Sequence, residues 1–285
     1  MIHQIIYLCD SHPECCLQTY IHKETRDIVL PPRKAMIICP GGSYENLSPR
    51  EADPIAEKFY AEGLNVFLFS YSLYPNAGNF LPLIELSMAI IHIRENAEKY
   101  YIDPNNIFVT GFSAGGHLAA SAATLWNCDA VCNALGIEDG KRSKCINRPT
   151  GVILCYPVIT GGKHTHSLTM DHVCGDVNIT EEKRNLFSLE KQVNFDTCPA
   201  FIWHTFNDNL VSVQNTLLYI NAMAEKGIPF EAHIYPYGQH GLALGTEQTA
   251  GSSTARINEH ISNWFGLAMK WIKDFDKITE VMKQT

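Results

Sequence analysis

The segment of residues 111–115, Gly-Phe-Ser-Ala-Gly, has the residue types and spacing of a serine nucleophile held on a sharp turn. A largely apolar run at residues 106–110 precedes it, and a stretch typical of a helix follows at residues 116–123. The small residues two positions before and after Ser113 allow a strand and a helix to pass closely, so that the serine hydroxyl is pushed outward. A hydroxyl presented in this way can attack the carbonyl carbon of an ester or an amide.

Acyl transfer by a serine also requires a base and a carboxylate that orients the base. After a nucleophile on such a turn, the chain order Ser, Asp, His is expected. Asp208 follows the apolar run 201–205 and precedes a turn and a helix, and His240 lies between two glycines in a loop after the last expected strand. We therefore expect Ser113 to act as nucleophile, His240 as base and Asp208 as the residue that orients the base.

An oxyanion hole combines the N–H of the residue after the nucleophile, here Ala114, with an N–H from the loop that follows an early strand. That loop is expected at residues 40–44, Pro-Gly-Gly-Ser-Tyr, where glycines let the backbone turn its N–H groups toward a substrate. We expect Gly42 and Ser43 to be the donors of this loop. Spacing alone leaves Gly41 open as a third candidate.

Other residues near these motifs fit the catalytic roles less well. The acidic residues of the segment 160–197 lie away from a strand end, and His117 is too close to the nucleophile in the sequence to act as its base. His204, in or at the tip of a strand, and Tyr44, in the Gly-Gly loop, are candidates for the wall of the pocket. A packing role fits both of them equally well.

Apolar runs alternate along the chain with stretches of helical spacing. This alternation predicts the α/β class, with a mostly parallel central sheet and helices on both faces. The final helical stretch carries an apolar stripe with two tryptophans, which is typical of core packing. Strands are expected at residues 18–22, 35–39, 65–71, 107–110, 151–157, 200–203 and 231–235, and helices at 54–62, 83–100, 211–226 and 255–275, besides the helix after Ser113.

Two irregular segments, at residues 127–149 and 160–197, interrupt the alternation. The second contains His164, His166 and His172 and a helical stretch near residues 181–189. Long insertions at the carboxyl edge of a sheet are typical of lids or specificity loops. Neither insertion has the composition of a separate domain and no repeat or linker is found, so residues 1–285 are expected to form one domain.

Composition excludes several classes of function. The 285 residues are 46% hydrophobic and carry a net charge of −8 without any run of Lys or Arg, which argues against a nucleic-acid partner or an anionic membrane surface. No apolar stretch approaches the roughly 20 residues of a membrane-spanning helix, and the first ten residues lack the pattern of a signal peptide, so a cytoplasmic location is expected. The ten scattered cysteines lack zinc-site spacing and are expected as reduced thiols, with Cys39 and Cys155 packing as small apolar residues.

Five sequence motifs indicate the family more closely: CPGGSY, LFSYSLYP, GFSAGGHLAA, FIWHTFNDNLV and YPYGQHGL. From about residue 18 to 275 the chain resembles serine esterases of the α/β-hydrolase fold. In particular, it is similar to the bacterial esterase/lipase group that includes acetyl-xylan-esterase-like and feruloyl-esterase-like (BD-FAE-like) enzymes. The resemblance implies the roles already given to Ser113, His240 and Asp208, an oxyanion hole, and no metal or organic cofactor.

These observations predict a serine carboxylesterase that hydrolyses small esters through an acyl-enzyme on Ser113. Acetyl esters of sugars or oligosaccharides are the expected substrates. The alternatives are a formamidase-like amidase, a dipeptidyl-type serine peptidase, and a catalytically inactive, ligand-binding member of the same fold. The expected partner is a small-molecule ester, with no nucleic acid and no membrane, and a homo-oligomer is compatible with the sequence.

Overall fold

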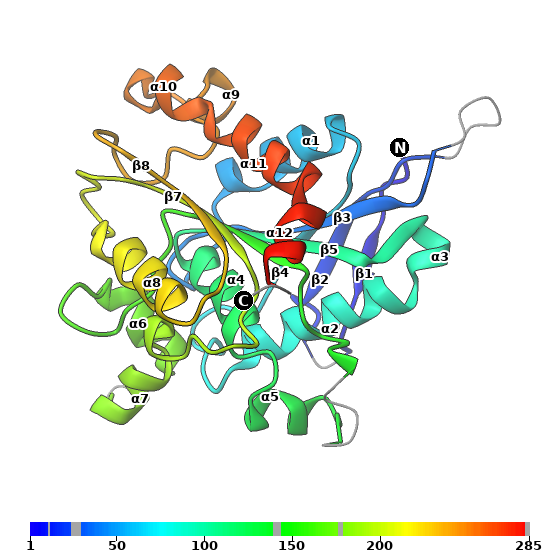
Figure 1. Ribbon diagram of the computed structural model, residues 1–285, viewed down its shortest axis with the longest axis horizontal. Coiled ribbons are helices and arrows are strands. Elements are labelled where there is room, and N and C mark those ends of the chain that lie inside the picture. Colours follow the sequence, from blue (N-terminus) through cyan, green and yellow to red (C-terminus); the bar gives the residue numbers. More distant parts are fainter. Residues whose placement is uncertain (11, 24–29, 139–143, 176–178, 283–285) are drawn as a thin grey trace.

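One eight-stranded sheet runs through the computed structural model, and its strands have the spatial order β1-β2-β4-β3-β5-β6-β7-β8 (Figure 1). The structure describes residues 1–10, 12–23, 30–138, 144–175 and 179–282. The strands are β1 (Ile5–Tyr7), β2 (Cys16–Tyr20), β3 (Arg33–Cys39), β4 (Asn65–Ser70), β5 (Ile102–Phe112), β6 (Gly151–Cys155), β7 (Ala200–Thr205) and β8 (Phe230–Tyr235).

Strands β3 to β8 are parallel to one another, whereas β2 pairs antiparallel with both β1 and β4. Parallel neighbours require a crossover connection, and most of these connections contain a helix. All parallel strands therefore end at the same edge of the sheet, and their following loops meet there. The α/β class with a mostly parallel sheet, predicted from the sequence, is confirmed.

The central strands are apolar over nearly their whole length because both faces of the sheet are covered. All five residues of β6 are buried, and Cys39 and Cys155 pack within β3 and β6 as small apolar residues. Successive side chains of a strand point to opposite faces, so Ile37 joins one core and Ile38 the other.

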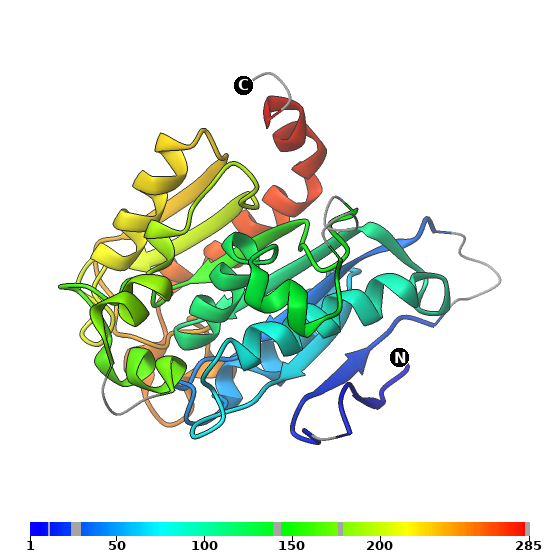
Figure 2. The same ribbon diagram turned by 90° about the horizontal axis from the view of Figure 1, so that it is seen from below.

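Helices cover both faces of this sheet, as Figures 1 and 2 show. One core contains Phe59 of α1 and Trp264 of α11, and the other contains Leu86 of α2, Leu118 of α4 and Met223 of α8. Among the described residues, no helix is both long enough and apolar enough to cross a membrane.

The α-helices are α1 (Asp53–Ala61), α2 (Leu81–Glu95), α3 (Ala97–Tyr100), α4 (Ala114–Thr124), α5 (Asp129–Ala134), α6 (Ser167–Cys174), α7 (Glu181–Leu186), α8 (Gln214–Glu225), α9 (Glu247–Ala250), α10 (Glu259–Ser262), α11 (Trp264–Lys273) and α12 (Phe275–Met282). The 3-10 helices used below are η1 (Pro49–Glu51), η3 (Leu189–Lys191) and η4 (Thr254–Arg256).

The second insertion, residues 160–197, packs onto the core that α2, α4 and α8 share. Met170 of α6 and Leu189 of η3 are fully buried there, and Phe187 packs beside them. The helix expected near residues 181–189 is present as α7, followed by η3. Helix α6 was not expected from the sequence. The insertion is thus anchored through its apolar side chains rather than lying free over the sheet.

Several further elements differ from the sequence prediction. Helix α5 lies within the segment 127–149, which was expected to be irregular, and the helix expected at residues 83–100 is divided into α2 and α3. The short edge strand β1 was not expected, and β5 begins at Ile102, before the Asp-Pro pair that we expected to precede the strand. Proline is tolerated because the pairing of β5 with β3 shifts register between Arg33 and Ala35, which leaves this part of β5 outside the regular ladder. The last helix is divided into η4, α10, α11 and α12, and the Asn258 side chain caps α10 by accepting from the N–H of Ile261.

We expect Trp264→Ala to lower the free energy of unfolding by about 3–5 kcal/mol, the usual cost of deleting a large buried aromatic side chain. Trp264 is fully buried, its ring stacks on Trp203 with 5.4 Å between centroids, and its indole N–H donates to the carbonyl of Ala243 at 2.9 Å. Urea unfolding followed by circular dichroism measures the change. The control Phe195→Ala removes a side chain that is 78% exposed and should stay within about 0.5 kcal/mol of the parent protein. Equal stability of the two variants would contradict the proposed role of Trp264 in the core.

Candidate active site

Ser113 lies at the junction of β5 and α4, in a backbone conformation that few L-residues adopt (φ 53°, ψ −116°). The two neighbouring glycines make the turn sterically feasible. A Cβ on Gly111 would lie 2.0 Å from the carbonyl oxygen of Gly115, and a Cβ on Gly115 would lie 2.1 Å from the carbonyl oxygen of Cys39. The N–H of Ser113 donates to the carbonyl of Cys155 at 3.0 Å, which fixes the turn at the carboxyl edge of the sheet.

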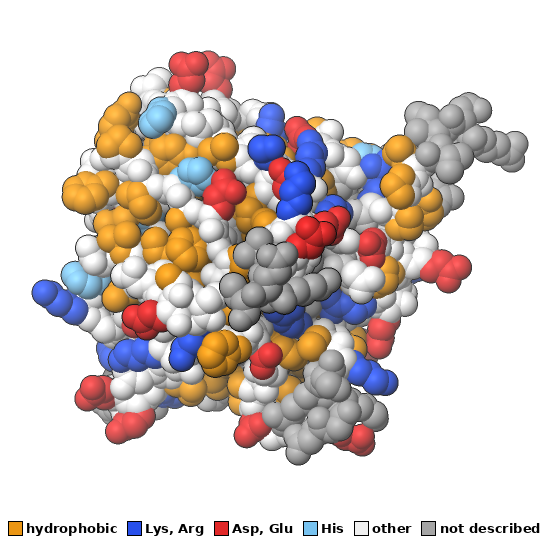
Figure 3. All heavy atoms as spheres, viewed as in Figure 1, with side chains coloured by type: hydrophobic (Ala, Val, Ile, Leu, Met, Phe, Trp, Pro, Cys, Tyr) orange, Lys and Arg blue, Asp and Glu red, His pale blue; other side chains and the backbone are white. Residues whose placement is uncertain are grey.

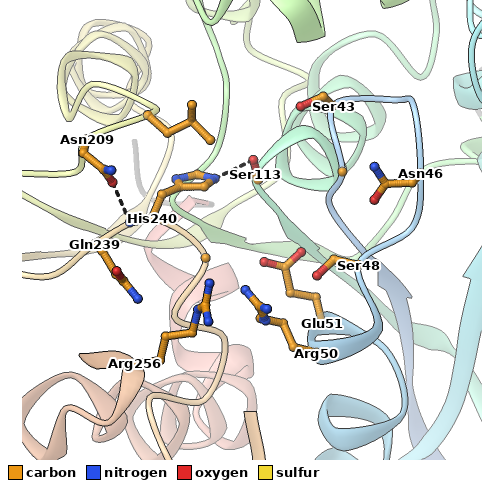
Figure 4. Close-up of a pocket in the computed structure, with 13 residues that line it drawn as sticks. Ser43, Asn46, Ser48, Arg50, Glu51, Ser113, Asn209, Gln239, His240 and Arg256 are labelled. Atoms are coloured by element: carbon orange, nitrogen blue, oxygen red, sulfur yellow. Dashed lines mark hydrogen bonds between the residues drawn. The ribbon is translucent and has the colours of Figure 1, made fainter. Parts of the chain in front are cut away.

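The structure brings Ser113, His240 and Asp208 into one hydrogen-bonded chain. The Oγ atom of Ser113 lies 2.8 Å from Nε2 of His240 (Figure 4). Nδ1 of the same ring lies 2.8 Å from Oδ2 of Asp208. The hydroxyl donates to Nε2 and the Nδ1–H donates to the carboxylate. This arrangement lets the imidazole take the serine proton while the carboxylate holds its orientation.

The carboxylate of Asp208 is almost completely buried and is surrounded by donors. The backbone N–H groups of Leu210 and Val211 each donate to Oδ1 at 2.9 Å, and His204 approaches Oδ2 to 3.4 Å. Burial by itself raises the pKa of Asp208, but the hydrogen bonds from His204 and His240 outweigh burial and hold that pKa below its usual range. The carboxylate therefore stays ionised beside the imidazole.

The ring of His240 is also held from the side. The ring of Tyr156 meets it edge-to-face, with 5.0 Å between centroids and 71° between planes, and the backbone N–H of His240 donates to Oδ1 of Asn209 at 3.2 Å. The Tyr156 hydroxyl donates to Oε1 of Glu51 at 2.8 Å and accepts from the N–H of Ala243 at 3.0 Å. Burial raises the pKa of Tyr156, so the phenol remains a donor to this carboxylate.

The loop after β3 lies directly against the nucleophile, since a Cβ on Gly41 would lie 2.9 Å from the Cβ of the serine. The N–H of Gly41 donates to Oε2 of Glu51 at 2.9 Å, so Gly41 is already engaged and does not face a substrate. The N–H groups of Gly42, Ser43 and Ala114 donate to no other group in the described part of the chain. These three N–H groups are therefore free to donate to an oxyanion, and their role as its donors stays a prediction.

Tyr44 and His204, our two candidates for the pocket wall, are instead buried and lie outside the lining of the pocket that contains the nucleophile. The Tyr44 hydroxyl donates to Nδ1 of His117 at 3.0 Å, and Nε2–H of His117 donates to the carbonyl of Phe187 at 3.0 Å. Burial lowers the pKa of His117 to about 4. Tyr44 and His117 thus connect the loop after β3 to the second insertion, and His204 supports Asp208.

A pocket of about 400 Å³ opens in front of Ser113 and His240. Figure 4 shows its side chains, which come from the loop after β3, from η1, from the loops after β7 and β8, and from η4. In the described ranges, no group of three or more His, Cys, Asp or Glu side chains is placed to hold a metal ion. Besides Ser113 and His240, the lining has polar side chains of four kinds: the amides of Asn46, Asn209 and Gln239, the hydroxyls of Ser43 and Ser48, the carboxylate of Glu51, and the guanidinium groups of Arg50 and Arg256.

Sequence reasoning missed three residues that shape this site: Glu51, Tyr156 and His172. Nδ1–H of His172 donates to the carbonyl of Ser43 at 2.8 Å, so one histidine of the second insertion holds the loop after β3. The sequence signal for Glu51 was weak, because Glu51 lies in η1, before the helix that the sequence predicts at residues 54–62. Tyr156 and His172 carry no comparable signal, since their contacts depend on distant segments.

A protein-family model named BD-FAE matches residues 26–223, more than half of the chain. The chain belongs to the BD-FAE family. Family members are esterases of the α/β-hydrolase fold, related to acetylxylan esterases and carboxylesterases. The resemblance proposed from the sequence motifs is therefore confirmed.

Two curated relatives of this BD-FAE chain are named for xylan. It is 40% identical to endo-1,4-beta-xylanase B of Butyrivibrio fibrisolvens over 219 aligned residues. The aligned region covers 76% of this chain and 33% of that protein. It is 28% identical to an acetylxylan esterase of Xylanibacter ruminicola over 221 aligned residues. This aligned region covers 76% of this chain and 42% of that protein. The chain thus spans between a third and a half of the length of these two relatives.

Solved structures match the BD-FAE chain over nearly its whole length. An acetyl ester-xyloside bifunctional hydrolase from Caldicellulosiruptor lactoaceticus has a TM-score of 0.80 at 29% identity and covers 96% of both chains. A carboxylesterase from Lactobacillus plantarum has a TM-score of 0.82 at 26% identity, covering 97% of this chain and 98% of the other. The eight-stranded sheet with its flanking helices is the α/β-hydrolase fold, and the chain is grouped with carboxylic ester hydrolases.

Glu51→Gln tests the carboxylate that joins the loop after β3 to Tyr156. A glutamine has one carbonyl oxygen for two donors, and its NH₂ group would face one of them, so a buried hydrogen bond is lost. We expect the free energy of unfolding to fall by about 1–3 kcal/mol. We also expect kcat to fall by about tenfold or more with a smaller change in KM, because the loop donors act mainly in the transition state.

Urea unfolding and steady-state hydrolysis of p-nitrophenyl acetate measure these two effects. The control Glu57→Gln makes the same change at an exposed position of α1. Parent-like kcat and stability in Glu51→Gln would show that this carboxylate does not hold the loop.

His117 predicts a pH dependence of stability. Its pKa is about 4 in the folded protein and near 6.5 when unfolded, so between these values the unfolded chain binds a proton that the folded chain does not. The stabilisation is therefore complete above pH 6.5 and is lost as the pH falls toward 4, by up to roughly 3 kcal/mol. Urea unfolding at pH 7.5 and pH 4.5 should give a steeper loss for the parent protein than for His117→Gln, which does not titrate. Parallel losses in both proteins would rule out this origin.

Proposed function

We propose that this BD-FAE chain is a serine carboxylesterase that hydrolyses small esters, with acetyl esters of sugars or short oligosaccharides as its substrates. The observation that carries the proposal is the chain of hydrogen bonds from Ser113 Oγ through His240 to Asp208, at the edge of a polar pocket. A hydroxyl, a base and an orienting carboxylate in this geometry are the groups that acyl transfer requires.

In the first half of the reaction, Ser113 Oγ attacks the ester carbonyl carbon as its proton moves to Nε2 of His240. The N–H groups of Gly42, Ser43 and Ala114, which have no other acceptor among the described residues, stabilise the negative charge that develops on the carbonyl oxygen by donating hydrogen bonds to it. Collapse of the tetrahedral intermediate breaks the C–O bond to the alcohol. The imidazolium returns its proton to the leaving alkoxide, and the acyl group stays on the serine as an ester.

In the second half, a water molecule takes the place of the alcohol. His240 Nε2 accepts a proton from this water as its oxygen attacks the acyl carbon, and the same N–H groups meet the second oxyanion. Breakdown of the intermediate gives the proton back to Ser113 Oγ and releases the carboxylic acid. Asp208, which stays ionised, stabilises the imidazolium in both halves.

The substrate class is supported by the relatives and by the pocket lining. The relatives include an acetylxylan esterase and an acetyl ester-xyloside bifunctional hydrolase. Amide and hydroxyl groups of Asn46, Ser48, Asn209 and Gln239 line the pocket and offer donors and acceptors to sugar hydroxyls. A polar pocket of this kind favours a short acyl group on a hydroxyl-rich alcohol over a long apolar chain.

Ser113→Ala should lower kcat for p-nitrophenyl acetate by several orders of magnitude, because the attacking oxygen is lost. Asp208→Asn should lower kcat by about 10⁴-fold, because the amide no longer fixes the tautomer of His240. Initial rates measure both changes. The control Ser87→Ala removes a buried serine hydroxyl that has no hydrogen-bond partner and lies outside the pocket, and it should retain activity. Near-parent hydrolysis by Ser113→Ala would refute the mechanism.

A substrate panel separates esterase from amidase and peptidase activity. We expect acetylated xylose and xylo-oligosaccharides to have a higher kcat/KM than aryl formamides and aminoacyl amides of similar size. The reverse order would replace the esterase proposal with an amidase that uses the same residues. No labelling by a fluorophosphonate probe would indicate an inactive, ligand-binding protein instead.

A further inference from the structure

Two arginines face the pocket beside the nucleophile. Arg50 belongs to η1 and Arg256 to η4, and both line the pocket that contains Ser113 and His240. In Figure 4 the two guanidinium groups point toward each other, on the side of the pocket that also holds the Glu51 carboxylate. The two residues are far apart in the sequence, so the fold itself brings these cations together.

Neither guanidinium has a partner among the described residues. Within the described part of the chain, the side chains of Arg50 and Arg256 form no hydrogen bond and no ion pair, and Nε of Arg256 is buried without an acceptor. A buried N–H without an acceptor costs free energy, and an acceptor bound in the pocket would remove that cost.

The other described arginines are all engaged. Arg33 donates to the carbonyl of Gly63, Arg94 to three backbone carbonyls, Arg148 to the carbonyl of Asp196, and Arg184 pairs with an aspartate. Figure 3 shows basic and acidic side chains side by side on one face of the molecule. Three lysines of α11 and α12 are likewise paired: Lys270 and Lys277 with Asp274, and Lys273 with Glu62. Within the part of the chain that the structure describes, the arginines without a partner are the two in the pocket.

Glu51, the acidic residue closest to them in the lining, does not serve as their counterion. Its Oε2 accepts from the N–H of Gly41 and its Oε1 from the hydroxyl of Tyr156. No ion pair joins Glu51 to either arginine. Two like charges on one side of a pocket disfavour each other unless an anion lies between them.

The cations also lie close to the reacting groups. Nη1 of Arg50 is 3.8 Å from the position that a Cβ on Gly241 would occupy, and Gly241 directly follows His240. The residue after Arg50, Glu51, holds the loop that contains Gly42 and Ser43. An anion held by Arg50 and Arg256 would therefore belong to the same small molecule whose ester lies at Ser113.

We propose that Arg50 and Arg256 form an anion-binding subsite that takes a carboxylate carried by the ester substrate. The inference rests on the proposed function and narrows its substrate class to acidic esters. A guanidinium matches a carboxylate with two parallel N–H donors, and a carboxylate with its ordinary pKa near 4 is ionised at neutral pH. The carboxylate belongs either to the alcohol part, as in an acetylated sugar acid, or to the acyl part, as in the half-ester of a dicarboxylic acid.

Two matched substrate pairs locate the carboxylate. The alcohol arm compares 4-acetoxybenzoate with its methyl ester, and the acyl arm compares p-nitrophenyl hydrogen succinate with p-nitrophenyl methyl succinate. The measured quantity is the ratio of kcat/KM for the charged ester to kcat/KM for the neutral ester. The variants are Arg50→Gln, Arg256→Gln and the double variant.

We expect a ratio above one in one arm of the parent protein, a fall of about tenfold in that arm for each single variant, and a larger fall for the double variant. Added salt should reduce the same ratio. The control Lys226→Gln removes one positive charge at the end of α8, four residues before β8 and at the opposite edge of the sheet from the pocket. It should leave the ratio unchanged.

Binding without turnover separates this inference from the proposed function. In Ser113→Ala protein, 4-acetoxybenzoate and p-nitrophenyl hydrogen succinate are each titrated against their neutral esters by calorimetry. Tighter binding of one charged ester, lost when both arginines are replaced by glutamine, supports the subsite whatever the outcome of the Ser113 turnover experiment. Equal ratios in the parent and the double variant in both arms, together with equal affinities, would overturn it.

Discussion

The backbone of Ser113 is held in a conformation that its own residue type disfavours, and the rest of the site is built around that turn. The strand before it and the helix after it approach so closely that neither Gly111 nor Gly115 has room for a Cβ. The end of β3 and the loop after it occupy the remaining side, with Cys39 of the strand and Gly41 of the loop against the turn. Because the turn cannot relax without separating these three segments, the hydroxyl is held still at the carboxyl edge of the sheet.

A second layer of contacts ties the loops of that edge together. The carboxylate of Glu51 receives one hydrogen bond from the loop after β3 and one from Tyr156, whose ring supports His240. On the face of the sheet covered by α2, α4 and α8, His117 is hydrogen-bonded to both Tyr44 and the carbonyl of Phe187. His172 donates a hydrogen bond to the carbonyl of Ser43. The loop that carries the proposed oxyanion donors Gly42 and Ser43 is thus fixed from both sides, as transition-state stabilisation would require.

Most strands of the sheet, and the grouping of Ser113, Asp208 and His240 in one site, could be predicted from the sequence. Both depend on local signals: apolar runs, glycine positions and the order of residues at strand ends. Sequence reasoning could not place Tyr44 and His204, whose side chains have polar partners inside the core. The divided C-terminal helix was also missed, since one apolar stripe continues across its breaks and periodicity does not record them. The pair Arg50 and Arg256 lies beyond such reasoning, because only the folded chain makes these residues neighbours in one pocket.

The residues of the site are far apart in the sequence, so the site forms only when distant segments of the chain have come together. His240 meets Ser113 across 127 residues, and Tyr156 meets Glu51 across 105. Contacts of this kind close long loops, and the entropic cost of that closure slows folding. During synthesis, a chain that has emerged as far as β7 already contains Ser113 and the loop after β3, but it lacks His240. The proposed catalytic site can therefore form only after β8 and the loop that follows it have been made.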